Sequence, residues 1–382
     1  MADVNLPPQI PVAVFMTRFH PGGTERQMIE LVRRLDQARF SVHVACFHRE
    51  GAWLPRVLER AASVVEFPIH GFARPDAGWQ LLSFARWCRR ERIAVVQTCD
   101  LYANTFGLPG AALAGVPVRI GSRRELNPDK TRWQIRGQRA AYRLATKVVA
   151  NSAAAGRMLR QEGLAPESIA VIPNGVDLEA YTGRAPSPQV RRIITVANLR
   201  PEKEHETLIA SAADLVRAWP NLRFQIVGGG PRERELRDLA AARGLTEHVE
   251  FLGHREDVPS LLASADAFVL PSRSEAFPNS VIEAMAAALP VVASSVGGLL
   301  DLIDHGRTGL LVPPSDAEAL TTALRFLIDN PTQSAAIGQA ARAEIRQRYS
   351  FERMVSAFEN LYASSLERRV SAGTHHVEAT GI

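Results

Sequence analysis

Short apolar, β-branched runs recur along the chain and alternate with stretches whose apolar residues have helical spacing. Such runs, bounded by turn residues, predict buried strands of a parallel sheet. They fall into two series: first 10–16, 41–47, 93–97, 116–120, 147–150 and 169–172, then 193–197, 223–228, 249–252, 267–270, 290–293 and 310–312. This alternation predicts an α/β protein with two doubly wound parallel sheets.

A polar segment, Y-T-G-R-A-P-S-P-Q at 181–189, separates the two series and indicates a linker. A chain of 382 residues is also too long for one ordinary core, so two domains are expected. We predict an N-terminal domain over 1–183 and a C-terminal domain over 190–350. The last helix is predicted over 351–368, and the tail at 371–382 is predicted to be disordered.

The composition, with 46% hydrophobic and 22% charged residues, is typical of a soluble globular protein. The first residues lack a basic stretch followed by an apolar core, so no secretory signal is expected. The most apolar long stretch, 281–300, contains Glu283 and Pro290 and is a poor candidate for a membrane span. Widely spaced cysteines predict neither a disulfide framework nor a metal site. We therefore expect a cytoplasmic protein.

Positive charge is concentrated in the first half of the chain. Residues 1–185 carry 25 Lys and Arg against 16 Asp and Glu, whereas the remainder carries 20 against 24. Arginines at 132, 136, 139 and 143 form one stripe if their segment is helical, and Trp133 and Tyr142 could flank that stripe at a membrane surface. A solvated helix face explains the stripe equally simply. An anionic partner, such as a phospholipid surface, is the functional alternative, and no motif supports nucleic acid.

Two carboxylates, Glu275 and Glu283, flank a predicted turn between a strand and a helix. Ligands of open parallel sheets bind at such turns, where helix N-termini present unpaired N–H groups. A helix would separate the two backbones by roughly 12 Å, beyond the roughly 5 to 9.5 Å of hydrolase acid pairs. The spacing therefore favours two residues that bind different parts of one long ligand over a hydrolytic acid/base pair. Ser280 and Glu283 also fit a capping box, which is a purely structural alternative.

Three further turns carry candidate phosphate-binding groups. Gly22 and Gly23 precede an amphipathic helix, where backbone N–H groups can approach a phosphate. Arg200 and Lys203 lie between a strand and a helix, where two cations could neutralise a diphosphate leaving group. Gly229 belongs to a weaker glycine-rich turn, G-G-G-P. An ordinary glycine turn and solvated loop charges are the structural alternatives.

Together, six motifs in this order resemble the family 4 retaining glycosyltransferases, the glycosyl transferases group 1. They are G-G-T-E (22–25), V-I-P-N-G-V-D (171–177), V-A-N-L-R-P-E-K (196–203), I-V-G-G-G-P (226–231), S-E-A-F-P-N-S-V-I-E-A-M-A (274–286) and G-R-T-G-L-L-V-P-P (306–314). Each motif is weak alone, but the ordered set is specific and the resemblance covers about residues 10–365. It implies the GT-B fold, in which two Rossmann-like domains face each other across a cleft and the last helix crosses back to the N-terminal domain. It also implies that the N-terminal domain lies on the acceptor side and that the C-terminal domain holds the nucleotide-sugar donor.

The resemblance also implies roles for individual residues. Glu283 is expected to bind the donor ribose, and Glu275 to face the transferred sugar. Lys203 is expected to stabilise the leaving diphosphate, which Gly22 and Gly23 approach from the other domain. The backbone of the segment between the two acids is expected to hold the sugar hydroxyls, through Ala276, Phe277, Pro278 and Asn279.

This chain departs from the family pattern at two places. Asn198 stands where an Arg is common, and Arg200 is the expected substitute. Cys99 stands where a His near the donor sugar is common, and the following Asp100 is expected to contribute there instead.

The resulting hypothesis is a retaining, metal-independent enzyme without a cofactor. It would transfer a sugar from a nucleotide-diphosphate sugar to a glycan or lipid-linked acceptor, in cell-surface polysaccharide or glycolipid assembly. The basic N-terminal domain suggests peripheral binding to the inner face of the cytoplasmic membrane. The alternatives are a nucleotide-sugar epimerase and an inactive sugar-nucleotide-binding homologue.

Overall fold

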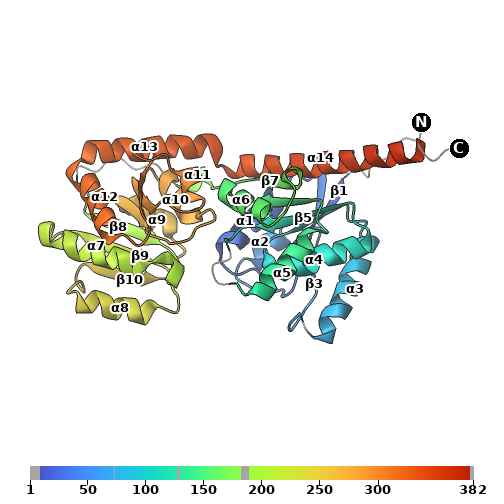
Figure 1. The fold of residues 1–382 in the computed structure, drawn as a ribbon, viewed down its shortest axis with the longest axis horizontal. Helices are drawn as coiled ribbons and strands as arrows, with labels where there is room; N and C mark the ends of the chain where they lie inside the picture. The colour runs from blue at the N-terminus through green and yellow to red at the C-terminus, as the bar shows by residue number, and fades with distance from the viewer. Residues whose placement is uncertain (1–8, 73, 127–129, 182–188, 379–382) are drawn as a thin grey trace. The chain divides into compact units, whose positions relative to one another are not determined.

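The computed structural model describes residues 9–72, 74–126, 130–181 and 189–378, the last nine of them by backbone only. The chain forms two compact units (Figure 1). One unit comprises the chain up to Pro173 together with the segment from Phe351 onward, and the other comprises Asn174–Ser350. Most of the predicted linker at 181–189 lies outside the described residues.

Within its described residues, the first unit is built on a seven-stranded parallel sheet, in the order β3-β2-β1-β4-β5-β6-β7. The strands are β1 (Ile10–Met16), β2 (Phe40–Cys46), β3 (Ser63–Glu66), β4 (Val95–Thr98), β5 (Val118–Arg123), β6 (Lys147–Ala150) and β7 (Ile169–Val171). The helices are α1 (Gly23–Arg34), α2 (Leu54–Leu58), α3 (Pro75–Arg90), α4 (Leu101–Ala114), α5 (Arg132–Tyr142), α6 (Ala153–Gln161) and α14 (Phe351–Glu378).

The described part of the second unit contains a six-stranded parallel sheet, in the order β10-β9-β8-β11-β12-β13. The strands are β8 (Arg192–Val196), β9 (Arg223–Val227), β10 (Val249–Gly253), β11 (Ala267–Leu270), β12 (Val291–Ser294) and β13 (Leu310–Val312). The helices are α7 (His205–Ala218), α8 (Glu233–Ala242), α9 (Val258–Ser264), α10 (Asn279–Ala286), α11 (Leu299–Leu302), α12 (Ala317–Asp329) and α13 (Pro331–Arg348). The predicted fold class, two Rossmann-like parallel-sheet domains, is confirmed.

Aromatic packing holds the first unit together around Phe15 of β1. Its ring is fully buried and lies 5.0 to 5.4 Å from the rings of Phe47, Phe84 and Phe106. The α14 helix joins the same core, because the buried ring of Tyr362 packs 6.1 Å from that of Phe40 in β2. Helix α14 therefore belongs to the first unit although it follows the second in sequence.

Strand β3 and helix α14 differ from the sequence prediction. Strand β3 was not predicted, because its four residues lie at the sheet edge and are only partly buried, so they lack the apolar run of a central strand. Helix α14 continues to Glu378, past the predicted end at residue 368, and no proline interrupts the sequence there. Residues 379–382 of the predicted tail lie outside the described residues. No helix in the described parts of the chain is long and apolar enough to span a membrane.

Candidate active site

The order of strands reverses between β8 and β11 in the second unit, and loops beyond such a switch point usually bind the ligand. Lys203 follows β8 and Glu275 follows β11, and the lysine Nζ donates to the glutamate Oε1 at 2.5 Å. The Ser272 hydroxyl donates to the same oxygen at 2.7 Å. Since Glu275 is only 7% exposed, these contacts hold its carboxylate in one place. The structure thus brings together two of the predicted site residues.

The loop between Glu275 and α10 is anchored from the segment that opens the second unit. The Asn174 side-chain amide donates to the Phe277 carbonyl at 3.3 Å and to the Asn279 side chain at 2.7 Å. The Phe277 ring packs 5.5 Å from that of Tyr349. The Phe277 side chain is thereby part of the core, and what this residue can offer a ligand is its main chain.

The structural alternative for Ser280 and Glu283, a capping box, is wrong. Helix α10 begins at Asn279 with Pro278 as the N-cap and no side-chain cap, so Ser280 already lies within the helix. Pro278 has the extended backbone of an N-cap, which its fixed φ allows, and the helix therefore starts two residues earlier than a Ser280 cap would place it. Glu283 lies one turn into α10 and is 7% exposed. Its carboxylate is therefore not explained by capping.

The remaining second-unit candidates lie in two loops that contact each other. Arg200 is exposed at the start of a short helical turn (Pro201–Lys203). The glycine turn after β9 packs against the preceding loop, because a Cβ on Gly230 would lie 2.6 Å from the Leu199 carbonyl oxygen. A Cβ on Gly229 would meet nothing within 4 Å. Of these two glycines, Gly229 therefore has the open space that a ligand could use.

Glu204 connects three loops at the carboxyl ends of the strands. Its backbone has a positive φ of 48°, and its buried carboxylate accepts from the Ser315 hydroxyl at 2.7 and 2.8 Å. Arg273 lies 3.6 Å from the same carboxylate. The loops that follow β8, β11 and β13 are thus held in register near Lys203.

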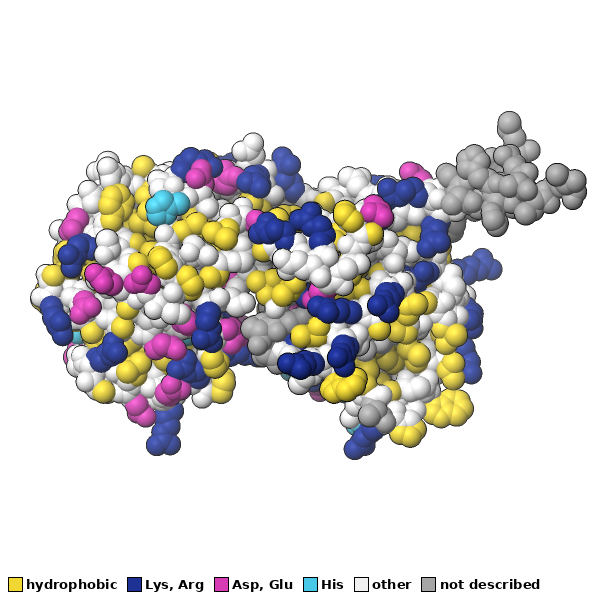
Figure 2. Space-filling model, in the orientation of Figure 1, with side chains coloured by type: hydrophobic (Ala, Val, Ile, Leu, Met, Phe, Trp, Pro, Cys, Tyr) yellow, Lys and Arg dark blue, Asp and Glu magenta, His cyan; other side chains and the backbone are white. Residues whose placement is uncertain are grey.

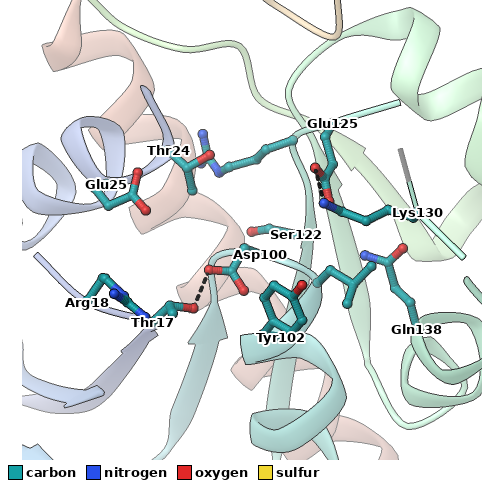
Figure 3. A pocket seen from close by; sticks show the side chains of 12 residues that line it. Thr17, Arg18, Thr24, Glu25, Asp100, Tyr102, Ser122, Glu125, Lys130 and Gln138 are labelled. Atoms are coloured by element: carbon teal, nitrogen blue, oxygen red, sulfur yellow. Dashed lines mark hydrogen bonds and ion pairs between the residues drawn. The ribbon is translucent and has the colours of Figure 1, made fainter. Parts of the chain in front are cut away.

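A cavity of about 240 Å³ opens at the corresponding switch point of the first unit, between β1 and β4 (Figure 3). Thr24 and Glu25 of α1 lie on one side of it, and Lys130 and Gln138 lie on the other. Asp100 follows β4 and lines the cavity, and its expected contribution near the donor sugar stays a prediction.

Three donors occupy the Asp100 carboxylate. The backbone N–H of Ala103 donates to Oδ1 at 2.8 Å, which makes Asp100 the N-cap of α4. Thr17 donates to Oδ2 at 2.7 Å, and the Cys99 thiol donates to the same oxygen at 3.2 Å. Asp100 is therefore rigidly placed at the cavity wall, and Cys99 is buried behind it.

Gly22 is the N-cap of α1, and the helix begins at Gly23. The Glu25 carboxylate folds back over this terminus, since a Cβ on Gly22 would clash with the glutamate Oε2. Burial raises the pKa of Glu25, and the neighbouring Asp100 raises it further. Burial likewise lowers the pKa of Arg124, another residue of the cavity wall, to about 10. The Glu25 carboxylate thus occupies the position at the α1 N-terminus where an external anion would bind.

Several residues of these sites were not predicted as site residues. Glu25 and Asn174 belong to quoted motifs, G-G-T-E and V-I-P-N-G-V-D, but spacing does not reveal where their side chains point. Thr17 and Ser272 are single hydroxyl residues after strands. The contact of Thr17 with Asp100 depends on the pairing of β1 with β4, whereas Ser272 contacts Glu275 within one loop. For Thr17 and Ser272, the available sequence signal was their position just after the carboxyl end of a strand.

The predicted arginine stripe lies on α5, whose N-terminus is closed by a capping box of Thr131 and Gln134. Its side chains are exposed at Arg132, Arg136, Arg139 and Arg143. Figure 2 shows basic side chains gathered over α5 and α6. Trp133 is 77% exposed, as a surface role requires. Tyr142 does not reach the surface beside the stripe, because it is buried and its hydroxyl donates to the Ser122 carbonyl.

Comparison with known proteins gives a family match for each unit. The family profile described as Glycosyltransferase Family 4 matches residues 21–180, and Glycosyl transferases group 1 matches 184–344. A D-inositol 3-phosphate glycosyltransferase from Saccharomonospora viridis is 31% identical over 303 residues, 73% of this chain and 67% of that protein. One from Streptomyces scabiei is 28% identical over 402 residues, 93% of this chain and 90% of that protein.

A solved structure shares the fold. The structure of Anabaena Alr3699/HepE, solved with UDP and glucose, superposes with a TM-score of 0.82 at 22% identity, over 93% of this chain and all of that one. Two Rossmann-like domains with these matches define a glycosyltransferase. The chain belongs to glycosyltransferase family 4, and its second unit matches the glycosyl transferases group 1.

Proposed function

We propose that this glycosyltransferase takes its sugar from a nucleotide-diphosphate donor bound by the second unit, and transfers it with retention of configuration. The observation that carries the proposal is the Lys203–Glu275 ion pair, fixed by Ser272 beyond the switch point of the sheet. A cation and a carboxylate held side by side can bind the diphosphate and the sugar of such a donor, respectively. Lys203 faces the anionic diphosphate, and Glu275 accepts hydrogen bonds from the sugar hydroxyls.

The other second-unit residues complete the donor site in this proposal. Glu283 binds the ribose hydroxyls, and Arg200 adds positive charge near the diphosphate. The open space at Gly229 admits the phosphates. The main chain of 276–279, anchored by Asn174, holds the sugar. A role for Gly22 and Gly23 at the phosphates additionally requires Glu25 to leave the α1 terminus.

Chemically, the acceptor oxygen bonds to the anomeric carbon on the face from which the diphosphate leaves. The bond from that carbon to the phosphate oxygen breaks, and the acceptor proton passes to the departing phosphate. Lys203 and Arg200 stabilise the charge that develops on the leaving group, while the carboxylates position the sugar. This scheme needs no covalent intermediate with the enzyme. Metal independence is part of the proposal.

A thermal-shift screen against nucleotide-diphosphate sugars tests the donor assignment, because a ligand that binds the native state raises the melting temperature with saturation. UDP-glucose is the first candidate, since the structurally similar Anabaena protein was solved with UDP and glucose. Incubation of the stabilising donor with an acceptor panel should then release nucleoside diphosphate, and proton NMR should show a product with the donor's anomeric configuration. Isomerised donor without transfer would instead indicate an epimerase, and binding without turnover an inactive homologue.

We also propose that α5 brings the enzyme to an anionic membrane surface, where a lipid-linked acceptor of cell-surface polysaccharide or glycolipid assembly would be found. Four exposed arginines on one helix face provide the charge. The Trp133 ring, which lies under the Arg136 guanidinium at 5.2 Å, provides an amphipathic side chain suited to the headgroup region. Peripheral binding at the cytoplasmic face of the membrane is part of this proposal.

A further inference from the structure

Four non-glycine residues in the described parts of the chain have a positive φ, the left-handed backbone that favours glycine. Arg92 and Ala288 lie just beyond the C-terminal ends of α3 and α10, where a left-handed residue commonly terminates a helix. Glu204 and Ser315, with φ of 48° and 59°, instead lie at or before the starts of α7 and α12. Termination of an α-helix therefore does not explain the second pair.

The side chains of this second pair contact each other, although they come from different loops. The Ser315 hydroxyl donates to both carboxylate oxygens of Glu204, at 2.7 and 2.8 Å, and Glu204 is only 4% exposed. Arg273 lies 3.6 Å from the same carboxylate, but its side chain is 60% exposed, so water weakens the attraction. A hydrogen bond to a buried charge stabilises more than one between neutral groups, and it can offset strain in the two backbones. The hydroxyl is thus the main contact that holds the Glu204 side chain.

Glu204 is also the joint between α7 and the short helical turn that carries Lys203. Its N–H donates to the Pro201 carbonyl within that turn at 3.3 Å, and its carbonyl accepts from the N–H of Thr207 in α7 at 3.0 Å. The left-handed backbone of Glu204 redirects the chain between these two helical segments. The conformation of this one residue therefore determines where the turn places Lys203.

The Lys203 ammonium depends on such placement. Its side chain is 20% exposed, and its Nζ donates to the Glu275 carboxylate. A lysine has a flexible four-carbon stem, so its ammonium stays at one position only where the backbone beneath it is fixed. A fixed cation stabilises developing charge better than a mobile one, because no reorganisation is needed during the reaction.

We infer that Glu204 is a positioning residue for Lys203, and that its hydrogen bond with Ser315 keeps the joint in the conformation that holds the ammonium at the leaving diphosphate. This inference rests on the proposed function, in which Lys203 stabilises that leaving group. The Lys203–Glu275 ion pair changes when Lys203 turns to a diphosphate, whereas the Glu204–Ser315 contact lies outside that exchange. The contact thus fixes the lysine both before and after the donor binds.

NMR of the lysine side chains tests the inference without any ligand, because the chain has three lysines, Lys130, Lys147 and Lys203. The full chain is labelled with [ε-13C]lysine, and the Lys203 signal is assigned from its absence in Lys203→Arg. In the wild type the two Hε protons of a fixed Lys203 should have different shifts. In Ser315→Ala, and in Glu204→Gly, they should merge into the narrow signal of a mobile side chain. Glu204→Gln should retain the wild-type signal, since its amide oxygen can still accept from Ser315.

Turnover of the donor that the thermal-shift screen identifies gives the second readout. Ser315→Ala and Glu204→Gly should each lower kcat about tenfold, as a misplaced catalytic group does, while KM for the donor changes less than about twofold. Adding Ser315→Ala to Lys203→Ala should cause no further loss of turnover, because the serine acts through the lysine. The matched control is Arg92→Gly, which removes a left-handed residue from the first unit and should leave both the Lys203 signal and kcat as in the wild type.

An unchanged Lys203 signal in both Ser315→Ala and Glu204→Gly would overturn the inference, and so would a further tenfold loss of turnover in the Lys203→Ala background. Normal turnover in Lys203→Ala alone would overturn the proposed function instead. Near-native circular dichroism of each variant shows that the change at Lys203 is local.

Discussion

Two adjacent glycines in the second unit have opposite surroundings. A Cβ on Gly230 would lie 2.6 Å from a backbone oxygen, whereas a Cβ on Gly229 would meet nothing within 4 Å. Gly230→Ala should therefore lower the free energy of unfolding by roughly 1–3 kcal/mol, while Gly229→Ala should change it by less than about 0.5 kcal/mol. If Gly229 faces the donor, its variant should nevertheless bind the donor more weakly. Denaturant unfolding and donor titration measure the two effects, and equal stability losses would contradict this account.

His205 gives the second unit a defined dependence on pH. The side chain is 1% exposed, and neither ring nitrogen has a hydrogen-bond partner among the described residues. Burial lowers the pKa of His205 to about 4, so the unfolded chain binds a proton more readily than the native one. Stability is therefore full above the unfolded pKa of about 6.5 and falls as the pH drops toward 4, by up to about 3 kcal/mol.

The control is His205→Leu, which keeps the site apolar and removes the titration. Urea unfolding between pH 7.5 and 4 should give a steeper loss of stability in the wild type than in this variant. Parallel curves for the two proteins would show that His205 is not the group responsible.

The sequence pattern predicted the exposure of some single residues but not the contacts of others. The exposed arginines and Trp133 were predicted from helical spacing alone, because a stripe of charge seldom faces a core. Tyr142 was misplaced, since its polar tip reaches the Ser122 carbonyl inside the protein and helical spacing does not show whether a side chain at the edge of a stripe is buried. The folding of Glu25 over Gly22 was also beyond prediction, because it depends on the cavity that surrounds it.

At the scale of elements, a buried ion pair connects β5 to the end of α6. Arg123 is fully buried, donates to the Glu162 carboxylate at 2.6 Å and donates to Gln138 of α5 at 2.7 Å. Glu162→Ala should cost roughly 3–5 kcal/mol, because it leaves a buried cation without its partner. Arg139→Ala removes an exposed cation 3.6 Å from the same carboxylate and should cost less than about 1 kcal/mol.

Denaturant unfolding of these two variants measures the difference directly. The Glu162 variant should also loosen α5, since the Arg123 side chain holds that helix through Gln138, and hydrogen exchange across α5 should speed up. Similar stability losses in both variants would contradict the assignment of the pair as a structural link.

Elements buried on both faces were predicted well from their sequence. Central strands such as β1 and β11 are continuous apolar runs, because helices cover both faces of a parallel sheet. Strand β3 escaped prediction since an edge strand is half solvated and short. The start of α10 was misjudged by two residues, because a proline before a helix competes with a serine cap as the start signal.

We predict that the protein binds anionic membranes through its first unit. Sedimentation with vesicles containing phosphatidylglycerol should recover the wild-type protein, and neutral vesicles should recover little. Each exposed arginine contributes about 1 kcal/mol near an anionic surface, so replacing Arg132, Arg136 and Arg143 by Gln should abolish recovery at physiological salt. The matched control replaces three exposed arginines of the second unit, Arg217, Arg234 and Arg255. Equal recovery with both vesicle types would remove the membrane proposal.

The central claim is that Lys203 and Glu283 act on different parts of one nucleotide-sugar donor. Calorimetric titration of the stabilising donor into the wild type, Lys203→Ala and Glu283→Ala, with nucleotide release measured on the same preparations, tests it most directly. Glu283→Ala should lose donor affinity by about tenfold or more, as expected for a lost charged hydrogen bond. Lys203→Ala should keep most of its donor affinity but lose turnover. Near-normal affinity and turnover in both variants would contradict the account.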